Sequence, residues 1–242
     1  MHQLPFTALL NKLLAGPVTA MLTALHVPVA HPEAPIANYV AMQIFVFLFS
    51  LLLFILVRVS LSVDKPGFLQ HMFEGIHGFI AGQGREIIGH HHVRFDSYLA
   101  ALGIFILLSN LIGLIPTFEA PTGFPYVPFG CAVVTWFYYH YQGIRANGFG
   151  YIKHFLGPIP ALAPLLLIIE MFSHLARMMS LTIRLFANIF AGDMVTMAFF
   201  SLVPIGIPLL FIGLHIGVSF IQTYIFVLLA TVYLAEATAH EH

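Results

Sequence analysis

The chain has 242 residues, of which 60% are hydrophobic and only 8% charged, and its mean hydropathy is +0.94. Soluble domains are roughly 45–50% apolar and about 25% charged, so this composition excludes a soluble globular fold and also a disordered chain. Nine Lys and Arg residues against ten Asp and Glu residues provide no basic surface for a nucleic-acid partner. The sequence therefore predicts an all-α polytopic membrane protein.

We divide the chain into an N-terminal periplasmic or interfacial segment, residues 1–37, and a single membrane domain, residues 38–242. The apolar run at residues 4–25 is interrupted by two prolines and a glycine and lacks a basic start. These features predict a helix on one membrane surface and argue against a signal peptide. Residues 27–35 contain three prolines and are typical of an extended loop. The single cysteine, Cys131, excludes an intramolecular disulfide.

The next four segments differ in how well they suit a bilayer, since a spanning helix needs about 20 mostly apolar residues. Residues 38–62 and 98–115 fit this length and are predicted to span. Residues 66–89 mix histidines and charges with apolar residues, which favours an amphipathic hairpin at the surface. Residues 127–142 carry several aromatic residues toward one end, and we predict a span with an interfacial aromatic belt.

Two apolar stretches at the C-terminus, residues 163–203 and 206–236, are too long for upright spans. A helix covering the first would measure about 60 Å, twice the hydrocarbon thickness of about 30 Å. Pro204 and Pro208 bracket a tight turn between them. We therefore predict a long tilted antiparallel hairpin over residues 163–236, which brings the total to about five spanning helices with additional amphipathic surface helices.

Lys and Arg residues in the loops predict the orientation of the chain, because they are enriched on the cytoplasmic side. The N-terminal segment carries only Lys12. The two segments that are predicted to be cytoplasmic carry Arg58, Lys65, Arg85, Arg94, Arg145 and Lys153. The N-terminus is thus predicted to be periplasmic and the C-terminus cytoplasmic, in a multi-pass protein of the cell inner membrane. A mitochondrial or thylakoid membrane is the alternative.

Arg184 lies near the middle of the first long stretch. A charge at the centre of a membrane helix costs about 2.5–3.5 kcal/mol on insertion scales, and an arginine cannot deprotonate to escape that cost. Snorkelling to the interface is the ordinary explanation, but the distance to either end of the stretch disfavours it. No carboxylate lies one helical turn from Arg184, so we expect its partner to come from another chain.

Each of the two long stretches carries a polar stripe at a spacing of 100° per residue. The first stripe comprises Glu170, His174, Arg177, Arg184 and Asn188, with Asp193 on the opposite side of the helix. The second comprises His215, Ser219, Gln222, Phe226 and Tyr233. Stripes of carboxylates and imidazoles within a membrane indicate proton or ion pathways. Hydrogen bonding between helices explains Ser219 and Gln222 as well, but it does not explain a fixed cation.

The run from Ser180 to Asp193 (SLTIRLFANIFAGD) resembles the signature of the a subunit of rotary F-type ATP synthases. The residues after it agree: His215 and Gln222 are followed by IFVLLATVYLAEA, and residues 110–116 (NLIGLIP) resemble the end of the family's second span. The likeness is strong over residues 170–236 and extends back toward Asn38, whereas the first 37 residues show nothing specific.

The resemblance implies a stator subunit beside a ring of c subunits, with b-type peripheral stalk subunits and the rest of the ATP synthase complex as further partners. Such a subunit conducts protons through two offset half-channels to and from the ring carboxylates, which couples the proton gradient to rotation and ATP synthesis. The chain is then a proton-translocating component with no catalytic residue, nucleotide site, cofactor or metal of its own.

By the same resemblance, Arg184 matches the family's essential arginine, which draws the proton off each ring carboxylate and blocks a direct leak between the half-channels. Asn188 and Gln222 match its polar neighbours. Always-charged arginine suits this separating role, because a desolvated lysine can lose its proton. Further candidates for lining the channel are His174, Ser219 and Tyr233.

Asp193 and His215 match residues of the outer half-channel, and Glu170 matches the acidic residue of the cytoplasmic half-channel. Asp193 departs from the family, which more often has Glu there. Because the side chain is one methylene shorter, its proton relay is expected to need an ordered water. All three residues are protonatable, so a proton is the default coupling ion, although the choice between proton and sodium lies mainly in the ring.

Two other functions are consistent with parts of the sequence. A secondary transporter would use Arg184 to hold an anionic solute, but it would need broken helices or internal repeats, and the sequence has neither. A His-rich membrane metalloenzyme is suggested by 14 histidines and the cluster His90–His92. The histidines show no repeated HxxxH or HxxHH pattern, so we interpret the cluster as the polar surface of a cytoplasmic loop.

Overall fold

The computed structural model describes residues 4–26, 31–62, 65–115, 118–148, 150–151, 163–202 and 207–239. Over these residues the secondary structure is helical and includes no strand, which confirms the all-α prediction. The helices are α1 (Pro5–Ala24), α2 (Asn38–Ser60), α3 (Phe68–Ile87), α4 (Val93–Leu111), α5 (Tyr126–Asn147), α7 (Ala163–Leu202) and α8 (Ile207–Thr238), with the short 3-10 helices η1 (Ile112–Leu114) and η2 (Pro121–Gly123).

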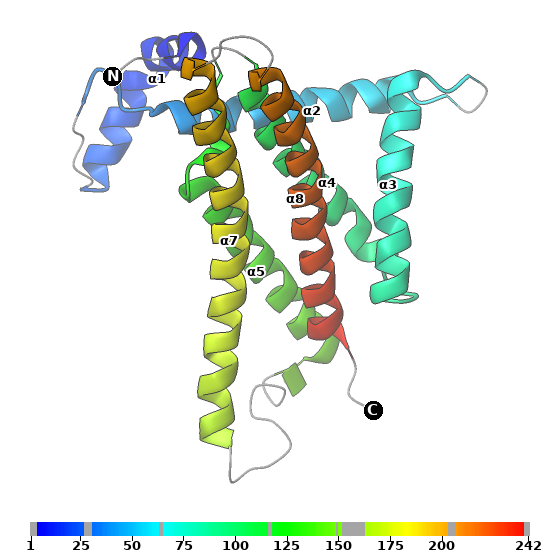
Figure 1. Cartoon of the computed structure of the whole chain (residues 1–242). Helices are drawn as coiled ribbons and strands as arrows, with labels where there is room; N and C mark the ends of the chain where they lie inside the picture. Colours follow the sequence, from blue (N-terminus) through cyan, green and yellow to red (C-terminus); the bar gives the residue numbers. More distant parts are fainter. Residues whose placement is uncertain are drawn as a thin grey trace.

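Helices α7 and α8 form the predicted hairpin and lie side by side along their length (Figure 1). Helix α7 has 40 residues without interruption, so it measures about 60 Å. The predicted turn at Pro204 lies outside the described residues, and Pro208 belongs to the first turn of α8. A proline is tolerated there because the first backbone N–H groups of a helix have no intrahelical acceptor.

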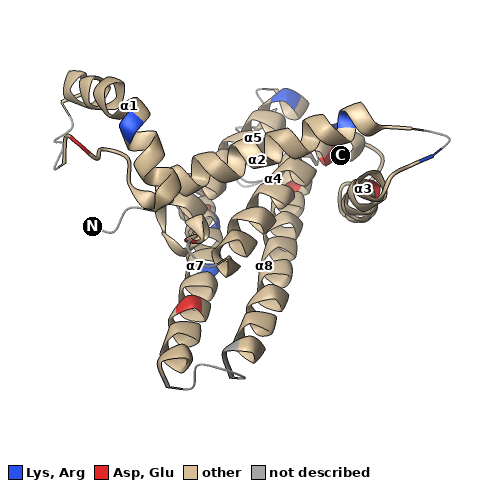
Figure 2. Cartoon of the chain, turned by 90° about the horizontal axis from the view of Figure 1, so that it is seen from above, with Lys and Arg blue, Asp and Glu red and all other residues tan. Residues whose placement is uncertain are grey.

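Helix α2 lies crosswise to α7 and α8 (Figure 1), and the view from above agrees (Figure 2). Its mean hydropathy reaches 2.8 over an 18-residue window, and its 23 residues match the length of an upright crossing of the bilayer. With α2 upright in the bilayer, α7 and α8, which lie crosswise to it, would cross the membrane at the strong tilt that their length predicts. Figure 2 also shows how few charged residues the long helices carry.

The segment predicted as an amphipathic hairpin is a single amphipathic helix, α3, so that part of the prediction is wrong. Its four inner glycines invite a turn, but glycine costs only about 1 kcal/mol in a helix interior, and no proline interrupts Phe68–Ile87. Helix α3 lies crosswise to α2 (Figure 1), which is the direction that a helix resting on the membrane surface takes.

Five described helices are long and apolar enough to span a membrane: α1, α2, α4, α7 and α8. This set differs by one member from the predicted set, because α1 was expected to lie on the surface and residues 127–142, now within α5, were expected to span. Helix α5 falls short because its polar aromatic half, which includes Tyr139, His140 and Gln142, lowers its hydropathy. The surface position of α1 stays a prediction.

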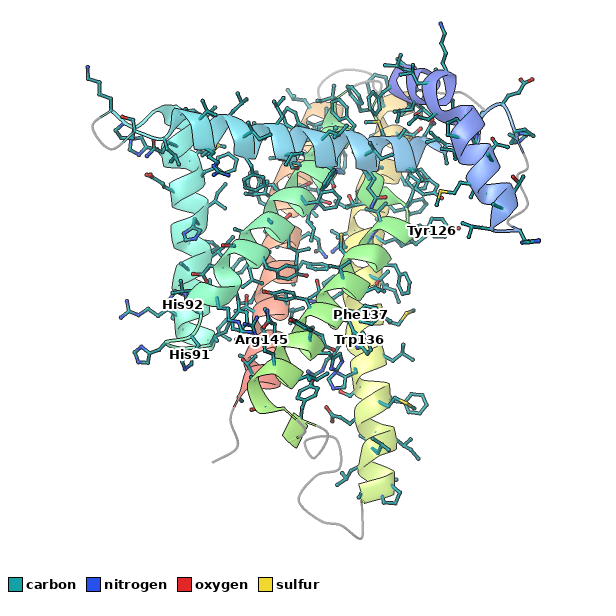
Figure 3. The ribbon with its side chains drawn as sticks, turned by 180° about the vertical axis from the view of Figure 1, so that it is seen from behind. His91, His92, Tyr126, Trp136, Phe137 and Arg145 are labelled. Carbon is teal, nitrogen blue, oxygen red and sulfur yellow. The ribbon has the colours of Figure 1, made fainter. Side chains whose placement is uncertain are left out.

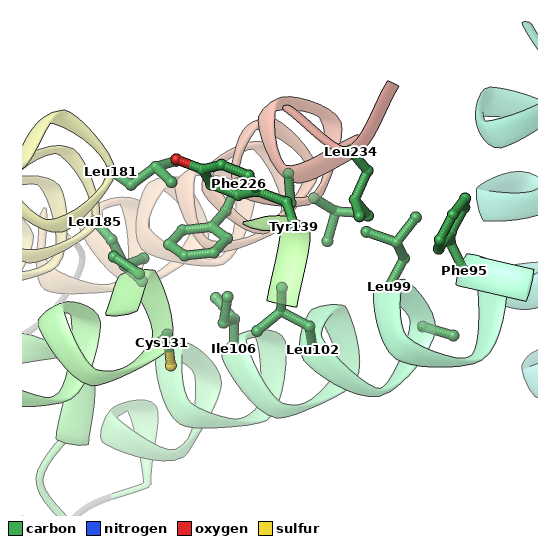
Figure 4. Packing of buried hydrophobic residues seen from close by; sticks show 14 of the residues in the cluster. Phe95, Leu99, Leu102, Ile106, Cys131, Tyr139, Leu181, Leu185, Phe226 and Leu234 are labelled. Atoms are coloured by element: carbon green, nitrogen blue, oxygen red, sulfur yellow. The ribbon is translucent and has the colours of Figure 1, made fainter. Parts of the chain in front are cut away.

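The apolar core lies where α4, α5, α7 and α8 meet (Figure 4). Its side chains recur at helical spacing on each element, and the largest fully buried ones include Leu99, Ile106, Leu185, Ile189, Phe226 and Leu234. Burying such a side chain contributes about 1.5–3 kcal/mol. This core fixes the spacing of the two long helices and therefore the positions of the polar stripes beside it.

The ends of α5 and α8 approach closely at Gly143. A Cβ atom at this position would lie 2.5 Å from the ring of Tyr151 and 2.9 Å from the carbonyl oxygen of Ala237. Close by, the Asn147 side-chain amide donates to the carbonyl oxygens of Ala237 and Ala239, at 3.3 and 3.2 Å. Gly143 therefore permits a contact that positions the C-terminal turn of α8.

We expect the substitution Gly143→Ala to lower the free energy of unfolding by about 1–3 kcal/mol, as overpacking does. The measurement is the melting temperature of the purified complex, and the readout is the fraction of this chain that the complex retains at each temperature. Gly130→Ala is the matched control on the same helix, because a Cβ atom there would meet nothing within 4 Å. Its effect should be neutral or slightly stabilising. Equal melting temperatures for the two variants would contradict the expectation.

Candidate functional site

Arg184 lies at the edge of the exposed face of α7. Its Nη2 donates to the hydroxyl oxygen of Ser180, one turn earlier, at 3.2 Å. Within the described ranges no carboxylate forms an ion pair with it, although other ion pairs join α7 to α8. Ala187 and Ala191 next to it are exposed. A fixed cation is thus displayed on a thin helix face, as expected for a partner carboxylate from outside the chain.

Asn188 and Gln222, predicted as neighbours of Arg184, meet each other across the hairpin. The Asn188 amide donates to Oε1 of Gln222 at 2.8 Å, and Gln222 is only 3% exposed. This bond joins α7 to α8 one turn from Arg184. It holds the two long helices in register at the level of the arginine.

Asp193 and His215 approach each other on the far side of α7 from Arg184. The carboxylate Oδ1 and the imidazole Nδ1 are 3.7 Å apart, which is too long for a direct hydrogen bond. The Nε2 atom of His215 has no hydrogen-bond partner among the described residues, and the side chain is almost fully buried. A buried imidazole with unmet hydrogen-bonding capacity is a typical binding place for an ordered water.

Gly192 brings α7 close to His215. A Cβ atom on this residue would lie 2.9 Å from the imidazole Nδ1, so any larger residue would push the histidine away. A Cβ atom on Gly123, in η2, would lie 3.5 Å from Oδ2 of Asp193. Asp193 therefore lies between η2 and α8, with its side chain about a third exposed.

Glu170 and His174 form a second carboxylate–imidazole pair, at the other end of the stripe. Glu170 Oε1 lies 3.3 Å from His174 Nε2, and the opposite ring nitrogen, Nδ1, is 2.9 Å from the hydroxyl of Tyr139 on α5. Tyr139 is 2% exposed, so it holds the imidazole from within the core. The predicted lining residue His174 is thus brought into contact with Glu170.

Arg177 lies between Glu170 and Arg184 on the same face of α7. Its guanidinium forms an ion pair with the carboxylate of Glu236 on α8 and lies 5.0 Å from the ring centroid of Tyr233. A small cavity of about 30 Å³ opens here, which is large enough to hold at least one water molecule. The cavity is lined by Tyr139, Tyr151, Glu170, His174, Arg177, Tyr233, Glu236 and Ala237.

Sequence reasoning missed the contribution of α5 to this cavity. His140 Nδ1 lies 2.7 Å from the hydroxyl of Tyr151, and the rings of His140 and His174 have centroids 4.7 Å apart. Burial raises the pKa of Tyr151 to about 12, so its hydroxyl stays protonated. The sequence did contain a pattern that could have indicated this contact. The buried residues Thr135, Tyr139 and Gln142 of α5 recur at helical spacing, which favours packing against another helix over an interfacial aromatic belt.

Ser219 and the His90–His92 cluster are placed elsewhere. Ser219 is fully buried and donates to the carbonyl oxygen of His215 in its own helix at 2.8 Å, while its carbonyl faces Asn110 of α4. His92 contacts Asp96 at 2.9 Å at the turn between α3 and α4 (Figure 3). In the part of the chain that the structure describes, no three metal-binding side chains gather.

Two long tilted helices that hold a fixed arginine between two carboxylate–imidazole pairs define an ion-conducting membrane subunit. The sequence model of the ATP synthase A chain matches residues 39–235, which cover the helices from α2 onward except the first residue of α2 and the last residues of α8. The chain belongs to the ATP synthase A chain family. It is therefore a multi-pass membrane protein and part of an ATP synthase complex.

Relatives named ATP synthase subunit a support this assignment over most or all of the chain. The protein of Koribacter versatilis is 66% identical over 242 residues, which is 100% of this chain and 99% of that protein. The protein of Solibacter usitatus is 52% identical over 213 residues, or 87% of this chain and 91% of that protein. The protein of Aquifex aeolicus is 39% identical over 186 residues, or 73% and 86%.

Proposed function

We propose that this chain is the stator channel subunit of an F-type ATP synthase and conducts protons through two offset half-channels to and from carboxylates on a ring of c subunits. The observation that carries the proposal is the setting of Arg184. It is a permanent cation on an accessible helix face, it has no carboxylate partner within the described residues, and a protonatable cluster lies to each side of it.

The outer half-channel is proposed to end at Asp193 and His215. Their separation of 3.7 Å suits a relay through one ordered water, because a bridging water makes hydrogen bonds nearly as good as a direct one. A proton from the periplasm would pass from this pair to a ring carboxylate that has just left Arg184. The neutral carboxyl group can then rotate into the apolar bilayer, where an ionised one would cost several kcal/mol.

Arg184 is proposed to separate the two half-channels. When a protonated ring carboxyl group returns to α7, the guanidinium favours its ionised form and the proton leaves. The permanent charge also prevents protons from passing directly between the two clusters. Asn188 and Gln222, joined at 2.8 Å, keep the two long helices fixed at this level, so that the arginine meets each ring carboxylate in the same position.

The inner half-channel is proposed to run along Glu170 and His174 to the cytoplasm. Their contact at 3.3 Å and the adjoining cavity allow a proton to move from the ring to water. Tyr233, which lines the cavity, supplies a hydroxyl on the α8 side. Each proton that crosses releases about 2.3 kcal/mol per 100 mV of membrane potential, so several are needed for each ATP, and a stepping ring supplies them.

The remaining parts of the proposal concern partners and orientation. The c-ring is the partner of the α7 and α8 face, and b-type stalk subunits hold the chain static. The protein lies in the cell inner membrane with a periplasmic N-terminus and a cytoplasmic C-terminus, following its Lys and Arg distribution. Residues 1–37 form the N-terminal segment, and the channel hairpin spans residues 163–236 within the membrane domain.

Photo-crosslinking in the assembled complex tests the proposal. Ala187 is exposed beside Arg184, and Ala187→Cys, in a chain whose buried Cys131 is replaced by Ser, is labelled with a thiol-reactive photo-crosslinker and should then capture a small apolar protein with one mid-helix carboxylate. Leu52→Cys on α2 is the control, because Leu52 is 51% exposed but lies on another helix. Capture of that protein equally at both positions, or at neither, would contradict the proposed interface.

Activity of the chain alone separates the proposal from the transporter alternative. A stator subunit reconstituted without its partners should move no solute, because the ring carboxylate is half of the pathway. Uptake of an anionic solute by vesicles that contain only this chain would favour the transporter. Stoichiometric iron in the purified chain would favour the metalloenzyme.

A further inference from the structure

The Arg177–Glu236 pair has no part in the mechanism above. Resting on that proposed function, we propose that Glu236 is a positioning residue that neutralises Arg177 in the cavity wall and so keeps the path from Arg184 to Glu170 passable for protons. A merely structural pair would hold α8 against α7. The pair inferred here also sets the electrostatic potential that each departing proton meets.

The geometry places Arg177 on the path itself. It follows Glu170 by seven residues and precedes Arg184 by seven, so all three lie on one face of α7, about 10 Å apart along its axis. A proton that leaves the level of Arg184 for Glu170 must pass the level of Arg177. Glu236 reaches this point from the last turns of α8.

The cavity contains two carboxylates, and each has its own partner. Glu170 contacts His174, whereas Glu236 pairs with Arg177. Among the described residues that line the cavity, Arg177 is the permanently charged cation. Glu170 can exchange protons because Glu236 supplies the negative charge that Arg177 requires.

Other groups around the cavity cannot take over this compensation. The titratable groups that face it are Tyr139 and His140 on α5, Tyr151, Glu170 and His174 on α7, and Tyr233 and Glu236 on α8. Glu170 and Glu236 are the two carboxylates in this set. The remaining groups are tyrosines and histidines, which are neutral or positive near pH 7. The Tyr233 ring offers Arg177 a cation–π contact at 5.0 Å, but it carries no net charge to balance the guanidinium.

The last turn of α8 is held so that Glu236 meets Arg177. Asn147 of α5 donates to the carbonyl oxygens of Ala237 and Ala239, and Ala237 itself is buried. Glu236 is half exposed and Arg177 is about a quarter exposed, so water can reach the pair. That access suits the mouth of a half-channel, where protons pass between a fixed site and bulk water.

The substitution Glu236→Gln tests the inference in the complete ATP synthase. In this variant the guanidinium of Arg177 is left unbalanced, about 10 Å from Glu170 along the helix axis. Its charge changes the protonation equilibrium of Glu170 by roughly tenfold at an effective dielectric constant near 20. We expect ATP-driven pumping in inverted vesicles to fall by about that factor at neutral pH. The half-maximal rate should move to a more acidic pH on the cytoplasmic side, because proton uptake there becomes harder.

The double variant Arg177→Gln with Glu236→Gln should restore pumping to near the original rate and pH profile, since it removes both charges. Arg177→Gln alone should move the half-maximal rate toward alkaline pH, the opposite direction, and Glu236→Asp should retain most of the activity. If Glu236→Gln does not assemble, the single Arg177→Gln variant still reports the sign of the shift. Chain content in the complex is measured for every variant.

An unchanged rate and pH profile in Glu236→Gln would overturn the inference. So would a double variant that is no better than Glu236→Gln, because lost packing, unlike lost charge balance, is not repaired by a second deletion. Arg184→Ala in the same assay tests the proposed function independently of the role of Glu236. If it stops pumping while Glu236→Gln does not, the stator function stands and the inference fails; if it pumps normally, the function itself fails.

Discussion

Replacing Arg184 by alanine is expected to abolish ATP-driven proton pumping by the complete ATP synthase. A guanidinium about 4 Å from a carboxylate stabilises the ionised form by about 4 kcal/mol at an effective dielectric constant of 20, which is roughly three powers of ten in its ionisation equilibrium. Without that charge the ring carboxyl group keeps its proton as it passes α7. The measurement is quenching of a pH-sensitive dye in inverted vesicles, with ATP hydrolysis followed in parallel.

Two further variants define the cause of the loss. Ser180→Ala removes the hydroxyl that accepts from Arg184 at 3.2 Å, and it should leave most pumping intact because the charge stays. Arg184→Lys should pump poorly, since a desolvated ammonium can release its proton. Vesicles with Arg184→Ala should also leak protons more readily when ATP is absent. Normal pumping by the alanine variant would contradict the proposed function.

Much of the fold was predictable because bilayer thickness restricts helix length. The residue pattern placed α2 and both long helices within a few residues of their observed bounds, and the mismatch between about 60 Å of helix and about 30 Å of hydrocarbon predicted their tilt. The prediction for α3 was wrong in one respect, because histidines and charges mixed with apolar residues over 66–89 do not distinguish one amphipathic helix from an amphipathic hairpin. Glycine weakens a helix without ending it when one apolar face runs throughout.

Residue spacing predicted the site only along single helices, whereas the grouping of Asp193 with His215 and of Asn188 with Gln222 across α7 and α8 came from the family resemblance. A spacing of 100° per residue placed Glu170, His174 and Arg184 on one face, but it gave no information about which residues of α5 would meet them. Tyr139 therefore went unnoticed as a partner of His174. Contacts between helices depend on tertiary packing. The residue pattern of one helix does not show which residues of a neighbouring helix lie at the same level.

Asp193→Asn is expected to lower pumping by about a hundredfold, the typical contribution of one positioned proton-transfer group. Asparagine has nearly the same shape, but it cannot take up a proton, so the relay to His215 stops. The contact between Asp193 and η2 should persist, and the chain should assemble normally. The readout is the pumping rate together with the amount of this chain in the complex.

Asp193→Glu distinguishes a relay from a packing role. The separation of 3.7 Å between Asp193 and His215 is slightly beyond hydrogen-bond reach, and one more methylene closes it. A relay that waits for an ordered water should therefore keep its rate or gain speed with glutamate. If the carboxylate serves packing alone, the longer side chain would crowd His215 beside Gly192, and pumping would fall as assembly falls. Wild-type pumping by Asp193→Asn would remove Asp193 from the pathway altogether, because no proton can pass through an amide in its place.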